Sequence, residues 1–216
     1  MRSGSRAAAL DAVTVDAFGT LVLLEDPTPR LRHALGDRGL DRSHETVAAA
    51  FRAEAAHYRA RLASGRDPHS LHELRVDCVG VFLEQVGATI EPAEFVDQFM
   101  DAIAFRLADG VVTTLDRLAA AGLELACVAN WDISLGPLLE RLGVAERFRV
   151  ILSSAEAGAE KPDPAIFILA LECLNAEPRR SLHVGDDDVD RNGAAAASLW
   201  FEPAPLATLP ERLGLA

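Results

Sequence analysis

The chain has 216 residues, of which 50% are hydrophobic and 25% charged, a balance that predicts a globular protein with a substantial core. Its net charge of −12 argues against binding nucleic acid or an anionic membrane surface, since both need a basic face. A small anionic substrate stays possible, because one local cation can dominate a pocket. One domain usually takes roughly 100–200 residues, so the length favours a single core with an insertion.

Cysteine usage and hydropathy bear on the compartment. Cys78, Cys127 and Cys173 lie inside apolar helical or strand patterns, so we expect buried thiols in a reducing environment and no disulfide framework. No apolar run reaches the roughly 18 residues of a membrane span, and the N-terminal segment lacks the apolar stretch of a signal peptide. We therefore expect a cytoplasmic protein without membrane contact.

Short apolar runs rich in Val, Ile and Leu predict the strands of a sheet. Helical patterns at residues 113–122, 133–143 and 162–175 separate the later runs. Alternating strands and helices are typical of an α/β fold, here a doubly wound, Rossmann-like parallel sheet with helices on both faces. The predicted strands lie at residues 11–18, 123–130, 148–154, 180–186 and 198–202.

A different region, residues 23–108, separates the first strand from the second and shows no convincing strand. Its apolar periodicity predicts four helices, one of them over residues 43–62. Asp67 and Pro68 form a good N-cap and first-turn pair for another helix, and Pro92 begins the last. We therefore predict a helical cap domain at 23–108 and a discontinuous α/β core domain at 1–22 and 109–216. A cap inserted there would form a lid over the end of the strand where ligands bind.

Four polar stretches follow four predicted strands: "DAFGT", "VANWD", "EKPDP" and "VGDDDVD". One such stretch alone is usually a turn, but the carboxyl ends of parallel strands share one edge, which makes four in this order a candidate site. Lys161 in the third stretch is the only lysine beside twenty arginines. A compact ammonium kept at this place suggests a group that binds a small anion.

These stretches resemble the motifs of the haloacid dehalogenase-like (HAD) hydrolase superfamily with a helical cap, over essentially the whole chain. That superfamily includes many phosphatases and some dehalogenases. The resemblance implies that Asp16 is the nucleophile, that Lys161 stabilises charge and that Asp190 (or Asp187) supports both. It also implies a Mg²⁺ ion bound by Asp16, the backbone carbonyl of Phe18 and Asp186, which is a hard-oxygen ligand set of the kind that Mg²⁺ prefers.

Further substrate-binding candidates are Thr20, Lys161 itself and Asn130, whose amide could donate a hydrogen bond to a transferring group. Two positions depart from the family pattern. Phosphatases of the family carry an acid–base aspartate where this chain has Phe18, and a serine or threonine where it has Ala129. Phenylalanine cannot protonate a leaving group, whereas dehalogenases, which release a halide, have an aromatic or apolar residue there.

Phe18 thus favours a dehalogenase, but the acidic loop, residues 186–190, favours a metal-dependent phosphatase, because four of its five residues are aspartates. Such a cluster repels itself unless a cation is present. His183, in the preceding strand, is expected to be a satisfied core residue and not a base.

Three hypotheses follow. The first is a Mg²⁺-dependent phosphatase that acts on a small phosphorylated metabolite through an aspartyl intermediate at Asp16. The second is a 2-haloacid dehalogenase, and the third is a catalytically degenerate protein that binds a phosphorylated ligand or a protein partner. The sequence leaves open the substrate, the cap residues that contact it, and whether the protein is a monomer or a homodimer.

Overall fold

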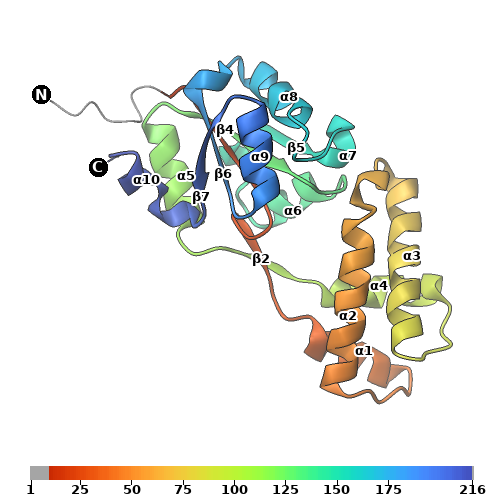
Figure 1. Ribbon diagram of the computed structural model, residues 1–216. Coiled ribbons are helices and arrows are strands. Elements are labelled where there is room, and N and C mark those ends of the chain that lie inside the picture. Colours follow the sequence, from red (N-terminus) through yellow and green to blue (C-terminus); the bar gives the residue numbers. More distant parts are fainter. Residues whose placement is uncertain (1–9, 216) are drawn as a thin grey trace, which may run out of the picture. The chain divides into compact units, whose positions relative to one another are not determined.

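The computed structural model describes residues 10–215, which fall into two compact units. One unit combines the described residues up to Leu23 with those from Leu107 onward, and the other is Leu24–Arg106. The first holds a sheet with its flanking helices, and the second is helical (Figure 1).

The first unit is built on a five-stranded sheet in the order β5-β4-β1-β6-β7, and every neighbouring pair is parallel. This confirms the predicted parallel α/β fold. The central strand, β1, is buried along its whole length because it has neighbours on both sides and helices on its faces. The strands are β1 (Ala12–Val15), β4 (Glu124–Ala129), β5 (Val150–Ser153), β6 (Ser181–Gly185) and β7 (Trp200–Pro203).

Helices cover this sheet. Alternate strand residues point to opposite faces, and Ala12, Ala126 and Val128 pack in one cluster with side chains of α8 and α9. α5 and α6 pack against β4 and β5 respectively. The helices of this unit are α5 (Val111–Ala120), α6 (Leu135–Arg141), α7 (Ser154–Ala157), α8 (Ala165–Leu174), α9 (Asp188–Ala196) and α10 (Leu209–Arg212), with 3-10 turns η3 (Ala145–Arg147), η4 (Pro178–Arg180) and η5 (Leu206–Thr208).

The second unit contains the four predicted helices, with α2 and α3 side by side and α1 and α4 packed against them (Figure 1). Ser43 caps α2 by accepting a hydrogen bond from the backbone N–H of Thr46, and Asp67 caps α3 as predicted. Phe82, Phe95 and Phe99 form the aromatic centre of its core. The helices are α1 (Thr28–Asp37), α2 (His44–Arg59), α3 (Pro68–Gln85) and α4 (Pro92–Ala102), with the 3-10 turn η2 (Leu62–Ser64).

Two sequence predictions were wrong in detail. Strands β2 (Val22–Leu24) and β3 (Phe105–Leu107) pair in a two-stranded sheet where no strand was predicted. They are the segments by which the chain leaves the first unit and returns, and pairing satisfies their backbone groups. Cys173 is exposed, because the face of α8 that carries it is not the face packed on the sheet.

No helix within residues 10–215 has both the length and the apolar run needed to cross a membrane.

Candidate active site

Asp16 directly follows the central strand β1, at the carboxyl edge of the sheet. Its backbone N–H donates to the carbonyl of Val184 on the neighbouring strand β6, at 2.8 Å. The chain continues from β1 to β4 on one side, while β6 lies on the other, and open α/β sheets bind ligands where the strand order reverses in this way. Asp16 is only 6% exposed, so its carboxylate needs polar partners.

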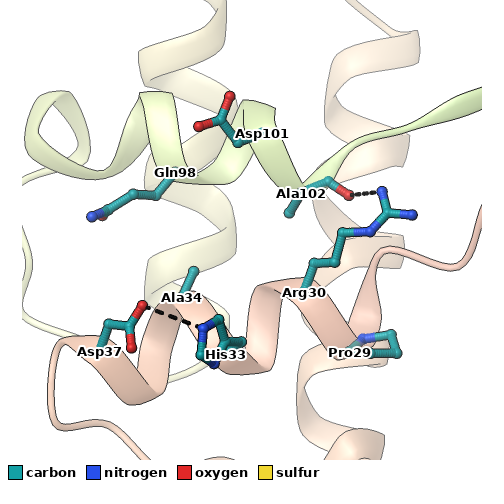
Figure 2. Close-up of a pocket in the computed structure, with 8 residues that line it drawn as sticks. All are labelled: Pro29, Arg30, His33, Ala34, Asp37, Gln98, Asp101 and Ala102. Carbon is teal, nitrogen blue, oxygen red and sulfur yellow. Dashed lines mark hydrogen bonds and ion pairs between the residues drawn. The ribbon is translucent and has the colours of Figure 1, made fainter.

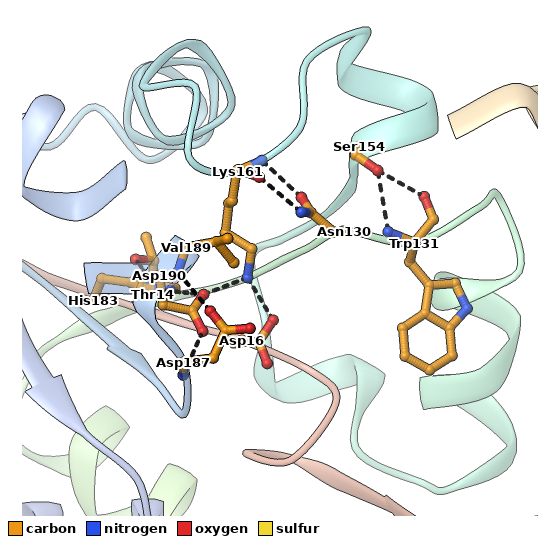
Figure 3. A network of polar contacts seen from close by, with 10 residues as sticks. All are labelled: Thr14, Asp16, Asn130, Trp131, Ser154, Lys161, His183, Asp187, Val189 and Asp190. Atoms are coloured by element: carbon orange, nitrogen blue, oxygen red, sulfur yellow. Dashed lines mark hydrogen bonds and ion pairs between the residues drawn. The ribbon is translucent and has the colours of Figure 1, made fainter. Parts of the chain in front are cut away.

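Lys161 is the partner of that carboxylate. Its Nζ atom donates to Oδ1 of Asp16 and to Oδ1 of Asp190, each at 2.5 Å, and the residue is 3% exposed (Figure 3). The backbone of Lys161 is held at the end of β4, where its N–H donates to Oδ1 of Asn130 at 2.7 Å and its carbonyl accepts from Nδ2 of Asn130 at 2.9 Å. The side chain of Asn130 thus fixes the backbone of Lys161 through two hydrogen bonds.

Asp190 lies in the first turn of α9 and is fixed from several directions. Oδ1 accepts hydrogen bonds from Lys161 and from Nε2 of His183, the latter at 2.9 Å. Oδ2 accepts from the backbone N–H of Asp187 at 3.4 Å, which closes a capping box at the start of the helix. A Cβ atom at Gly185 would overlap the Asp190 carboxyl group, so only glycine admits this close approach. The arrangement holds Asp190 against the lysine.

The charges of this cluster follow from burial and from the partners. Burial alone favours neutral forms, but Asp16 and Asp190 outweigh it at Lys161 and raise the pKa of the ammonium. Burial likewise opposes ionisation of Asp190, yet the hydrogen bond from His183 and the charge of Lys161 lower the pKa of its carboxyl. At Asp16 the effect of burial is larger than the opposing effect of the Lys161 charge, and the negative charge of Asp190 acts in the same direction as burial. The pKa of the Asp16 carboxyl is therefore raised.

A third carboxylate completes the cluster. Side-chain oxygens of Asp16, Asp186 and Asp190 all lie within 4.8 Å of one another. Asp186 is exposed as a residue, but its carboxyl is partly shielded from water by the neighbouring groups. This desolvation, together with the charges of Asp190 and Asp187, raises the pKa of the carboxyl. Three acidic groups beside one ammonium leave an excess of negative charge. Hard oxygen donors at such spacing fit a divalent cation such as Mg²⁺.

Comparison with protein families agrees with this geometry. The family model of haloacid dehalogenase-like hydrolases matches residues 10–198, which include all the residues of the cluster. The chain is a haloacid dehalogenase-like hydrolase. This HAD-like hydrolase is 30% identical over 196 residues to haloacid dehalogenase-like hydrolase domain-containing protein 3 of Bos taurus, a match that covers 82% of this chain and 77% of that protein. It is 36% identical over 103 residues to N-acetylmuramic acid 6-phosphate phosphatase of Pseudomonas aeruginosa, covering 45% and 46% respectively.

Solved structures share the fold of this HAD-like hydrolase. A HAD phosphatase from Thermococcus onnurineus superposes with a TM-score of 0.59 at 20% identity, covering 95% of this chain and 98% of that one. A 2-haloacid dehalogenase from Pseudomonas syringae superposes with a TM-score of 0.65 at 22% identity, with the same coverage. Since enzymes of both classes have this architecture, the fold does not choose the reaction.

The remaining predicted residues belong to the same unit as the cluster. Phe18 is 50% exposed, so part of this large apolar residue faces solvent at the surface of the HAD-like core. Thr20 is buried, and its hydroxyl has no hydrogen-bond partner within the described part of the chain. Ala129 ends β4 and is buried.

Sequence reasoning missed one part of the network. His183 is fully buried, as predicted, but Nδ1 lies 2.8 Å from Oγ1 of Thr14 and Nε2 contacts Asp190. His183 and Thr14 occupy paired positions on β6 and β1. The sequence offers a hint only in retrospect, because polar residues at matching positions of two buried strands must satisfy each other or a third group.

The helical unit has an open groove of about 520 Å³ between α1 and α4 (Figure 2). Its charged groups largely pair with their own surroundings. Arg30 donates to the carbonyl of Ala102 at 3.2 Å, and His33 lies 3.8 Å from Asp37. Nothing in this groove resembles the buried cluster of the core. The lining residues are Pro29, Arg30, His33, Ala34, Asp37, Gln98, Asp101 and Ala102.

Proposed function

We propose that this HAD-like hydrolase is a Mg²⁺-dependent phosphatase that acts on a small phosphorylated metabolite through an aspartyl phosphate at Asp16. The observation that carries the proposal is the buried contact between Asp16 and the only lysine of the chain, beside two further carboxylates. An anionic nucleophile can attack an anionic phosphate only where cations offset the repulsion. The phosphatase name of the Pseudomonas aeruginosa relative adds support.

Asp16 and Asp186, together with the backbone carbonyl of Phe18, would hold the ion. When bound, Mg²⁺ offsets the negative charge of the phosphoryl oxygens and of the carboxylates. Lys161 would donate a hydrogen bond to a phosphoryl oxygen through its third ammonium hydrogen, since the other two bond to Asp16 and Asp190. Thr20, whose hydroxyl has no partner among residues 10–215, is the further candidate for a substrate contact.

In the first step a carboxylate oxygen of Asp16 attacks phosphorus, and the bond from phosphorus to the leaving oxygen breaks, with its electron pair departing on that oxygen. In the second step water attacks phosphorus, and the bond from phosphorus to the Asp16 oxygen breaks with its electron pair returning to the carboxylate, while the protons of the water leave with the phosphate. Phe18 cannot protonate the leaving oxygen. We therefore infer substrates whose leaving groups are stable as anions, such as acyl or aryl phosphates.

The test is hydrolysis of p-nitrophenyl phosphate with Mg²⁺. Activity should disappear with EDTA and return with added Mg²⁺. Asp16→Asn should remove it, while Asp188→Asn, the same charge change at an exposed position of the acidic loop, should retain it. Rapid quenching followed by mass spectrometry should find one phosphoryl group on the peptide that contains Asp16. Turnover that survives the loss of metal would refute the proposal.

A second candidate is a 2-haloacid dehalogenase, and Phe18 is the observation that favours it, because a halide leaves without a proton. The acidic cluster argues against it, since a departing halide would be repelled by three carboxylates within 4.8 Å of one another. Release of chloride from 2-chloropropionate in the presence of EDTA would decide for this candidate. If neither substrate is turned over, a rise in melting temperature with Mg²⁺ plus inorganic phosphate would indicate a binding protein.

A further inference from the structure

The buried pair of Thr14 and His183 has no part in the chemistry described above. Both residues are fully buried, and His183 packs edge-on against Phe167 with ring centroids 4.8 Å apart. Packing explains an apolar ring, but an imidazole costs free energy to bury unless both nitrogens have partners. Both do, and one of the partners is Asp190.

The donors in this chain of contacts can be assigned. Burial is the main cause that lowers the pKa of His183 to about 4, so the ring is neutral and carries one N–H. Asp190 is ionised and only accepts, which requires the hydrogen to be on Nε2. Nδ1 must then accept, and the hydroxyl of Thr14 supplies its hydrogen over 2.8 Å, since the alternative acceptor, the carbonyl of Leu182, lies farther away at 3.4 Å.

The consequence reaches Lys161. His183 and Lys161 donate to the same oxygen of Asp190, which lies between them. Without the imidazole donor, the Asp190 carboxylate would keep, within the described part of the chain, two hydrogen bonds: the 3.4 Å contact from the Asp187 backbone and the one from the ammonium itself. It could then turn about its Cβ–Cγ bond, and the lysine would lose its fixed direction.

We propose that His183 is a positioning residue, which, with its tautomer set by Thr14, orients Asp190 and through it the ammonium of Lys161 toward Asp16. His183 touches neither substrate nor reacting atoms. This inference rests on the proposed function for its effect on rate, but the hydrogen-bond chain itself is independent of any activity.

The single lysine makes the chain of contacts measurable. In protein labelled with ¹⁵N only at lysine, the ammonium gives one signal, because Lys161 is the only lysine. A second sample, labelled at histidine, reports the tautomer of His183, whose signals are assigned by their loss in His183→Gln. We expect a neutral ring with hydrogen on Nε2 at neutral pH. A hydrogen on Nδ1, or an imidazolium, would overturn the proposal whatever the activity of the variants.

Matched variants test the rest. His183→Gln places an amide N–H near the position of Nε2, whereas His183→Asn places one near Nδ1 and cannot reach Asp190. With p-nitrophenyl phosphate and Mg²⁺, we expect His183→Asn to lower kcat about 10- to 100-fold with little change in KM, the size of effect seen when an orienting hydrogen bond is removed. His183→Gln should recover most of the loss. The Lys161 signal should move in the Asn variant and stay near its native position in the Gln variant.

Thr14 supplies a second pair with less effect on packing. Thr14→Val removes the hydroxyl at constant shape and should lower kcat and shift the Lys161 signal in the same direction, while Thr14→Ser should not. Unchanged kcat and an unchanged lysine signal in folded His183→Asn or Thr14→Val would overturn the inference. If the wild-type protein does not hydrolyse p-nitrophenyl phosphate, the proposed function fails, and the two NMR measurements still decide the positioning role.

Discussion

Gly19 and Asp186 lie so close together that no other residue could replace the glycine without moving the carboxylate. A Cβ atom at position 19 would lie 2.6 Å from Cγ of Asp186 and overlap Oδ2. Gly19 also has a φ of +82°, which side chains rarely adopt. The turn after Asp16 thus brings the first motif and the acidic loop together, although about 170 residues separate them in the sequence.

This contact gives the first prediction. Gly19→Ala should displace Asp186 and raise the Mg²⁺ concentration for half-maximal activity by about 10-fold or more. Gly122→Ala is the control, since Gly122 has a φ of +81° but no heavy atom of the described residues lies within 4 Å of an added Cβ. Each variant should lose about 1–2 kcal/mol of stability from backbone strain. Equal Mg²⁺ requirements in the two variants, measured by activity titration, would contradict the role of this contact.

Phe18 gives the second. An aspartate at that position would supply the missing acid–base group, so Phe18→Asp should raise kcat/KM on alkyl phosphates. The expected gain lies within the roughly 10²- to 10⁴-fold that such a group contributes. Phe18→Leu, which removes the ring without adding an acid, should not raise it. The ratio of alkyl to aryl phosphate turnover in the three proteins checks this, and a constant ratio would count against the proposed chemistry.

Lys161 gives the third. Lys161→Met keeps the apolar stem but leaves Asp16 and Asp190 buried without their cation, which we expect to cost about 3–5 kcal/mol in the free energy of unfolding. The double variant Lys161→Met with Asp190→Asn should be more stable than the single variant, because it also removes the buried negative charge of Asp190 that the single variant leaves without a cation. Urea unfolding of the three proteins without metal measures this. A double variant less stable than the single one would show that the pair is not coupled as the contacts indicate.

The fourth prediction concerns Glu54, in the helical unit. Burial raises the pKa of this α2 carboxyl to about 7 from 4.5, against the hydrogen bond from Cys78 and the charge of Arg59. The folded protein therefore holds the proton more tightly than the unfolded chain. The stability that protonated Glu54 contributes to the fold is fully present below about pH 4.5. It is lost as the pH rises through 7, which lowers the free energy of unfolding by up to about 3 kcal/mol.

Glu54→Gln should consequently be more stable than the wild type at pH 8 and similar to it at low pH. Glu84→Gln, at an exposed position of α3, should follow the wild type at both pH values. Urea unfolding followed by far-ultraviolet circular dichroism at two pH values separates the variants. A wild type and a Glu54→Gln variant with the same pH dependence would contradict the burial of an ionisable group here.

Much of the fold could be predicted because its determinants are local. Apolar runs of four to six residues specified the strands, and caps such as Asp67 before Pro68 specified helix starts. The same reasoning missed β2 and β3, which are short and are stabilised by each other more than by any pattern of their own. It also misplaced Cys173, because an apolar helix does not reveal which face will be packed.

By itself, the sequence determined the family and the meeting of four polar stretches at one sheet edge, since parallel strands must bring their carboxyl ends together. It also identified Lys161 as the cation, by its being the only lysine. Only the tertiary structure decided the partners within that edge. That Asn130 binds the backbone of Lys161, and that His183 donates to Asp190, depends on side-chain directions and distances of less than 3 Å. Such contacts are set by how the strands and loops pack, and no spacing in the sequence encodes them.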